Sequence, residues 1–150
     1  MLYEQALAIF RELGDRWGIA GTLTDLGNLA REQRNFSLAH SLYRESLILF
    51  MTLEHKRGIA RLLEYVACSA AAQLEAERSL RLAGAAAALR QNIGTPLPPA
   101  EQSNLEAMLD PARQALGNTA SATMWLEGWV MPLDQAIQDA LMREIASPSG

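Results

Sequence analysis

The sequence has little of several features on which common functions depend. It holds one cysteine, Cys68, which excludes an internal disulfide and is typical of a reducing compartment. Aromatic residues make up only 6% of the chain. No apolar run approaches the roughly 20 residues that span a bilayer, and the first residues do not read as a signal peptide. We therefore expect a cytoplasmic protein that does not enter a membrane.

Positive charge is also scarce. The chain has 13 Lys and Arg against 17 Asp and Glu, a net charge of −4, and no basic cluster. The electrostatic footprint of a nucleic-acid binder is therefore missing. The two histidines, His40 and His55, are not at ligand spacing, and Cys68 has no His or Cys near it in sequence. We expect no cofactor, no metal site and no enzymatic activity.

What the chain does have is a repeat of forty residues. The segment Leu2–Ala20 lies over Leu42–Ala60, and Leu, Tyr, Leu, Phe, Leu, Gly, Ile and Ala coincide, eight of nineteen positions. A fixed period of this size is typical of repeat proteins, in which each unit buries its apolar face against the next. We therefore expect Tyr3 and Tyr43 to occupy equivalent environments.

The apolar residues follow the i, i+3, i+4 spacing of amphipathic helices. No stretch of alternating polar and apolar residues is long enough for a strand. The fold class expected is all-α. Two-residue polar joints separate the helices, and joints that short make neighbouring helices antiparallel. The spacing predicts helices over residues 16–33, 36–53 and 56–73, followed by one that carries Ser79, Leu82, Ala83, Ala86 and Ala87.

The pattern changes after residue 93, where Gly94 and several prolines break the helix. Pro99 can open a new helix, which Pro111 either splits into two or kinks. A shorter helix carries Trp125 and Trp129, which we interpret as a plug at the end of the repeats. The sequence thus predicts helical repeats over 1–93, a helical extension or cap over 94–147 and a tail over 148–150.

One unit shows small and large residues in a definite order. Its first helix has the pair Leu26-Gly27 with Ala30 one turn later, and its second has Ala39 and Tyr43. In this order the unit resembles the tetratricopeptide repeat family, in a long variant of about forty residues. In the next unit the glycine has become Ala67 and the aromatic residue Ala83, and we expect closer helix packing there.

The resemblance implies a right-handed solenoid of antiparallel hairpins that serves protein–protein interaction. In similar proteins the first helices line a groove that grips a peptide, and Asn28 matches an asparagine that bonds the peptide backbone. The alternative is that these side chains face water or the next helix. Carried over position by position, the candidate groove residues are Thr24, Asn28, Arg31, Arg61, Glu64 and Cys68.

Arrays of this kind followed by a helical tail resemble the carboxy-terminal part of large bacterial signal-transduction ATPases and LuxR-type transcriptional regulators. The first unit is only half present, so the apolar face of its helix lacks an upstream partner. We expect either a fragment of a longer array or a homodimer that covers Leu2, Leu7 and Phe10. Two functions stay open: capture of a protein or peptide segment, and self-association as a structural spacer within a regulator.

Overall fold

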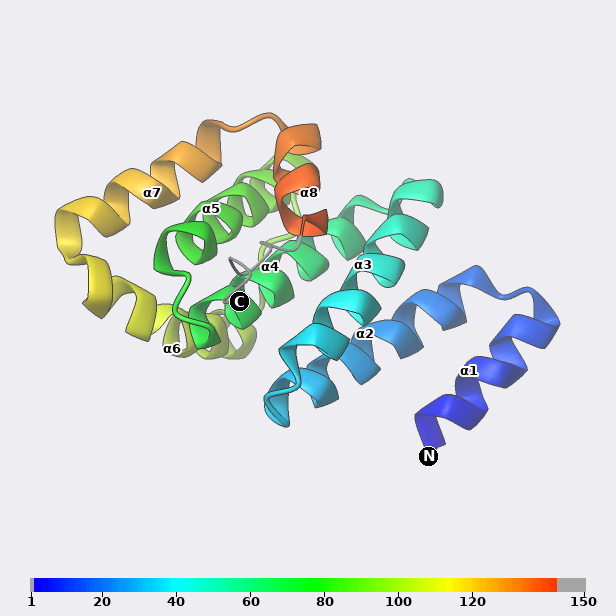
Figure 1. Cartoon of the computed structure of the whole chain (residues 1–150). Helices are drawn as coiled ribbons and strands as arrows, with labels where there is room; N and C mark the ends of the chain where they lie inside the picture. The colour runs from blue at the N-terminus through cyan, green and yellow to red at the C-terminus, as the bar shows by residue number, and fades with distance from the viewer. Residues whose placement is uncertain (1, 143–150) are drawn as a thin grey trace.

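The computed structural model of the protein describes residues 2–142. These residues form helices and no strand, which confirms the all-α fold class (Figure 1). Helix α1 lies at one end of the molecule, and α6 and α7 lie at the other. The helices are α1 Leu2–Leu13, α2 Arg16–Glu32, α3 Phe36–Thr52, α4 Lys56–Ala72, α5 Ala76–Ile93, α6 Pro99–Leu116, α7 Asn118–Val130 and α8 Leu133–Leu141.

The joints between the first five helices share one backbone conformation. Each has a left-handed residue one or two positions after the helix, and the amide of the following residue bonds to the last part of that helix, as His55 N does to Phe50 O at 2.9 Å. This position favours glycine, yet three of the four joints place another residue there at a cost of about 1 kcal/mol. The left-handed residues are Gly14, Arg34, Glu54 and Leu74, with φ of 68°, 60°, 54° and 66°.

The residue after each left-handed position is the N-cap of the next helix. The side chains of Asp15, Asn35 and His55 accept a hydrogen bond from the amide three residues on and so cap α2, α3 and α4. Glu75 occupies the same place before α5 without a side-chain cap bond. The joint thus recurs every twenty residues, half the sequence repeat, and the predicted helix boundaries are confirmed to within a residue.

Helices α2 and α3 pack through a glycine and a tyrosine. A Cβ atom on Gly27 would lie 2.6 Å from the ring of Tyr43, which is 1% exposed. The expectation that Tyr3 and Tyr43 are equivalent is wrong, since Tyr3 is 38% exposed. The reason is physical: Tyr43 packs on the helix that precedes its own, and no described helix precedes α1.

The extension and the repeats share one hydrophobic core. Leu109 and Ala112 of α6 and Ile137 of α8 belong to the same buried cluster as Leu47 and Leu63. Helix α6 is single and runs through Pro111, so of the two alternatives left open by the sequence the single helix is the one observed. Helix α8 folds back over α3, α4 and α5 (Figure 1).

Candidate functional site

Arg31 on α2 is a buried charged residue. Its side chain faces α4, where the guanidinium carbon lies 5.7 Å from the centre of the Tyr65 ring. The residue is 9% exposed, and among residues 2–142 its Nη1 atom has no hydrogen-bond partner. A buried cation without an anion is costly, because a face of an aromatic ring replaces only part of its hydration. The position therefore favours an anion.

Asn28 lies one turn before Arg31 on the same face of α2. The hydroxyl of Tyr43 donates a hydrogen bond to Asn28 Oδ1 at 2.6 Å, which fixes the amide and leaves its NH₂ group as a donor. The Tyr43 ring in turn stacks on Tyr65, with centroids 6.1 Å apart. Burial raises the pKa of Tyr43, so its hydroxyl keeps the proton that this bond requires. Two donors, on Asn28 and Arg31, therefore lie on one face.

Cys68 completes this group from α4. It is 4% exposed, and burial raises the pKa of its thiol to about 11, an effect to which the charge of Glu64 adds and which Arg31 opposes. The thiol is therefore protonated at neutral pH and is no nucleophile. We call the residues Asn28, Arg31, Tyr43, Tyr65 and Cys68 the Arg31 site.

Two of the candidate groove residues lie inside the molecule, contrary to expectation. The Thr24 hydroxyl donates to Ala20 O at 2.8 Å and lies 2.7 Å from the hydroxyl of Ser46, between α2 and α3. Glu64 is 6% exposed and forms an ion pair with Arg90 on α5. Both predictions went wrong because the sequence does not fix how a helix is rotated about its axis.

Arg61, the remaining candidate, is exposed on α4. Its charge lowers the pKa of Asp25 on α2, although burial of that carboxyl has the larger effect and leaves the pKa raised. Arg61 therefore faces the α2–α4 boundary from the solvent side. Of the six predicted groove residues, the structure brings Asn28, Arg31, Arg61 and Cys68 to that boundary.

The expected self-association face is largely covered by the chain itself. Leu7 is 8% exposed and packs with Leu23 and Leu26 of α2. The ring of Phe10 lies against Gly18, where a Cβ atom would come within 2.5 Å of it. The side chain of Leu2 lies outside the described part of the molecule. Helix α2 thus buries Leu7 and covers Phe10 in part, which leaves little of these two side chains for a second copy.

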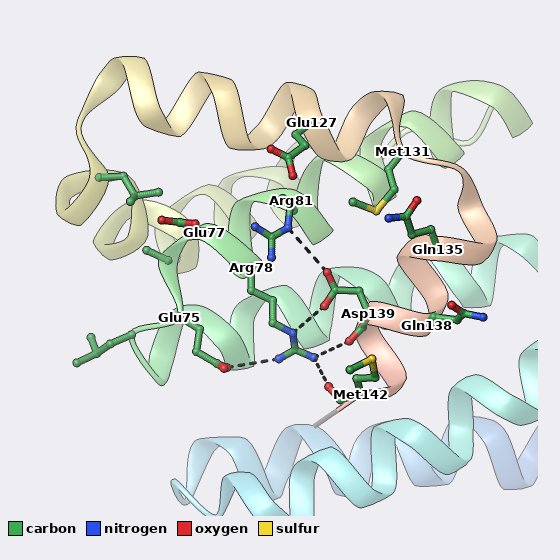
Figure 2. Close-up of a pocket in the computed structure, with 13 residues that line it drawn as sticks. Glu75, Glu77, Arg78, Arg81, Glu127, Met131, Gln135, Gln138, Asp139 and Met142 are labelled. Atoms are coloured by element: carbon green, nitrogen blue, oxygen red, sulfur yellow. Dashed lines mark hydrogen bonds and ion pairs between the residues drawn. The ribbon is translucent and has the colours of Figure 1, made fainter. Parts of the chain in front are cut away.

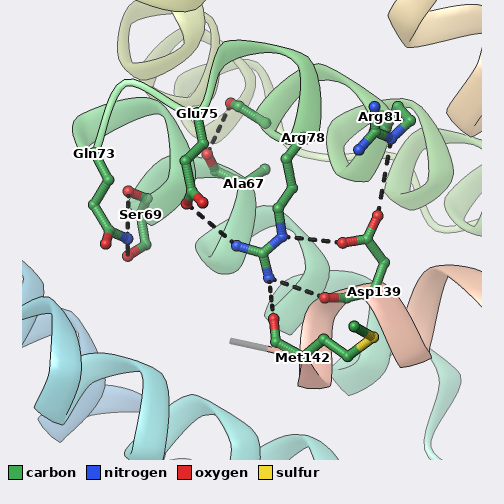
Figure 3. A network of polar contacts seen from close by, with 9 residues as sticks. Ala67, Ser69, Gln73, Glu75, Arg78, Arg81, Asp139 and Met142 are labelled. Atoms are coloured by element: carbon green, nitrogen blue, oxygen red, sulfur yellow. Dashed lines mark hydrogen bonds and ion pairs between the residues drawn. The ribbon is translucent and has the colours of Figure 1, made fainter. Parts of the chain in front are cut away.

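A second polar site, which the sequence did not suggest, lies where α5, α7 and α8 meet. A cavity of about 900 Å³ lies there, and Arg78, Arg81, Glu127 and Asp139 are among the residues that line it (Figure 2). Arg78 donates from Nε to Asp139 Oδ1 at 3.0 Å and from Nη2 to the carbonyls of Asp139 and Met142, both at 2.9 Å (Figure 3). The arginine thus binds carbonyls that the end of α8 leaves without helical partners.

Substitution of Arg78 by alanine is expected to release α8 from the rest of the molecule. The side chain is 12% exposed and its bonds to Asp139 and the two carbonyls have no replacement. Hydrogen bonds to charged groups contribute about 1.5–3 kcal/mol. Hydrogen exchange of the α8 amides should therefore quicken by roughly tenfold or more, while exchange in α2 and α3 stays unchanged.

Arg81→Ala is the matched control for this change. Arg81 lies one turn further along α5 and its Nε is 3.9 Å from Asp139 Oδ2, the weaker contact of the two. Exchange in α8 should change little in this variant. Equal exchange rates in the two variants would show that Arg78 does not hold the helix.

Comparison of the chain with protein-family models, with curated proteins and with solved structures gave no match. None of the helices between residues 2 and 142 is long and apolar enough to cross a bilayer. Within the same range, no three His, Cys, Asp or Glu side chains gather closely enough to hold a metal ion.

Proposed function

We propose that the chain is a protein-interaction module of the tetratricopeptide kind, with its hairpins stacked as a right-handed solenoid and a helical cap. In this proposal the Arg31 site binds a carboxylate of a protein segment, either an acidic side chain or a chain end. The observation that carries it is Arg31, a residue that is 9% exposed and whose Nη1 atom is buried without a hydrogen-bond partner among residues 2–142. The resemblance to bacterial transcriptional regulators suggests the larger setting in which such a module works.

The chemistry of the site favours a carboxylate over an uncharged group. An unsatisfied buried donor costs about 1–3 kcal/mol, and more when it is charged. A carboxylate can accept two parallel hydrogen bonds from a guanidinium, which makes this the strongest of the ordinary side-chain pairs. The NH₂ group of Asn28, held by Tyr43, offers a further donor to the peptide backbone. The helices are already formed, so the receptor loses little entropy on binding.

A selection from a random displayed peptide library tests this proposal. We expect the wild-type chain to enrich peptides that share an Asp, a Glu or a free carboxyl terminus. Arg31→Met should weaken the binding of the selected peptides by tenfold or more, because their carboxylate loses its cationic partner. Arg44→Met, at an exposed arginine of α3, is the control and should bind as the wild type does. Enrichment without an acidic group, or equal binding by both variants, would contradict the proposal.

Self-association is the second candidate, and one observation favours it. Helix α1 packs mainly against α2 and leaves Tyr3 38% and Ile9 55% exposed. A second copy that covered this side of α1 would remove both from water. Sedimentation over a dilution series should then show a dimer in the wild type and a monomer in Ile9→Asp. A wild-type monomer at every concentration would leave peptide capture as the function.

A further inference from the structure

A second cavity lies between the repeats and the cap. It has a volume of about 470 Å³ and is formed by α4, α5, α6 and α7. Most of its lining is apolar, and the indole rings of Trp125 and Trp129 stack with their centres 5.1 Å apart. Its apolar lining residues are Ala83, Ala87, Gly94, Pro96, Leu97, Leu105, Leu109, Trp125 and Trp129.

The sequence repeat explains why space is left here. Forty residues earlier, the positions of Ala83 and Ala87 hold Tyr43 and Leu47, both of which are almost completely buried. The large side chains fill the first unit, and the alanines leave the second one open. The replacement of an aromatic residue by Ala83 predicts closer helix packing, yet Ala83 lines an open cavity. Protein interiors retain few voids larger than a water molecule.

The polar side of this cavity is electrically neutral. Both oxygens of Glu64 accept from Arg90, and Arg90 Nη1 donates to Thr95 O at 3.1 Å. At the other side Glu106 forms an ion pair with Arg113. Every charge is therefore matched, and a charged ligand would find no counter-charge. The Glu64 oxygens keep lone pairs and can accept a further hydrogen bond.

We propose that this cavity binds a neutral aromatic small molecule that donates one hydrogen bond to Glu64. The volume lies in the range of small-molecule sites and is too small for a folded peptide segment. The two indoles supply faces for an aromatic ring, and the alanines leave room beside them. This site shares no residue with the Arg31 site, so each proposal has its own test.

Titration with N-phenyl-1-naphthylamine, a neutral aromatic amine with one N–H donor, tests the proposal. We expect a saturable rise in dye fluorescence at one dye per chain. Ala87→Leu restores the residue of the first unit, fills the cavity and should weaken binding at least tenfold. Ala88→Leu adds the same volume one residue along α5, outside the lining, where the first unit has the exposed Ile48, and should bind as the wild type does.

The indole N–H signals of the wild-type chain give a second measurement that needs no filled variant. Trp125 and Trp129 should shift on addition of the dye, and Trp17, which lies on α2 away from this cavity, should not; the Trp17→Phe variant assigns its signal. The proposal is overturned if the dye does not saturate, if Ala87→Leu and Ala88→Leu bind it equally, or if only the Trp17 signal moves.

Discussion

Replacement of Gly128 by alanine should destabilise the protein by about 2 kcal/mol or more and detach the cap. Helices α5 and α7 cross at backbone contact: a Cβ atom on Gly128 would lie 1.8 Å from Arg81 O, and one on Gly84 would lie 2.0 Å from Trp125 O. Backbone atoms cannot rotate away, so the helices would have to separate. The gain in helix propensity of about 1 kcal/mol offsets only part of this.

Gly21→Ala is the matched control for this experiment. Gly21 also lies inside a helix, α2, but a Cβ atom there would meet nothing within 4 Å. The alanine should therefore stabilise the protein by roughly 0.5–1 kcal/mol. Urea unfolding followed by circular dichroism measures both changes, and tryptophan fluorescence reports on Trp125 and Trp129 in the cap. If the free energy of unfolding changed in the same direction in Gly128→Ala and Gly21→Ala, the close crossing of α5 and α7 would be contradicted.

Glu64→Ala should lower the free energy of unfolding by about 3–5 kcal/mol. The Glu64 carboxylate and the Arg90 guanidinium are both buried, at 6% exposure each, and pair with each other between α4 and α5. Burial raises the pKa of Glu64, and the hydrogen bond and charge of Arg90 oppose that rise. Without the carboxylate, a buried cation would keep only its bond to Thr95 O.

The double variant Glu64→Leu with Arg90→Met shows whether the loss comes from the unpaired charge. Replacing both members of a buried ion pair by apolar residues of similar size is often neutral or stabilising. We therefore expect the double variant to unfold at a urea concentration close to that of the wild type. If it lost as much stability as Glu64→Ala, the pair itself would be the source of stability and our explanation would be wrong.

Much of the fold could be predicted from local sequence. A short polar joint follows each helical apolar pattern, as at Gly14, Asp15, Arg34 and Asn35. A joint of this kind fixes where the next helix begins to within a few residues. Proline and glycine marked the change after α5, and Pro99 marked the start of α6. These signals act over one or two turns, so no long-range contact is needed to interpret them.

The candidate site could be predicted only in part, because its contacts depend on how the helices are rotated. Asn28 and Arg31 were found from the family pattern, but the burial of Arg31 depends on Tyr65, thirty-four residues later. The pairing of Glu64 with Arg90 crosses twenty-six residues and no local pattern announces it. One usable signal was overlooked: a glycine inside a helix, such as Gly84, often marks a close helix crossing.

The free energy of unfolding of Arg31→Met tests the central claim most directly. Methionine keeps much of the length of the side chain and removes the charge. If Arg31 serves to bind an anion of a partner, the free energy of unfolding of the free protein should rise by about 1 kcal/mol in this variant. The reason is that the substitution removes a buried charge that has no anion beside it. If the cation instead stabilises the fold through its contact with Tyr65, the free energy of unfolding should fall by about 1 kcal/mol, and that result would contradict the account.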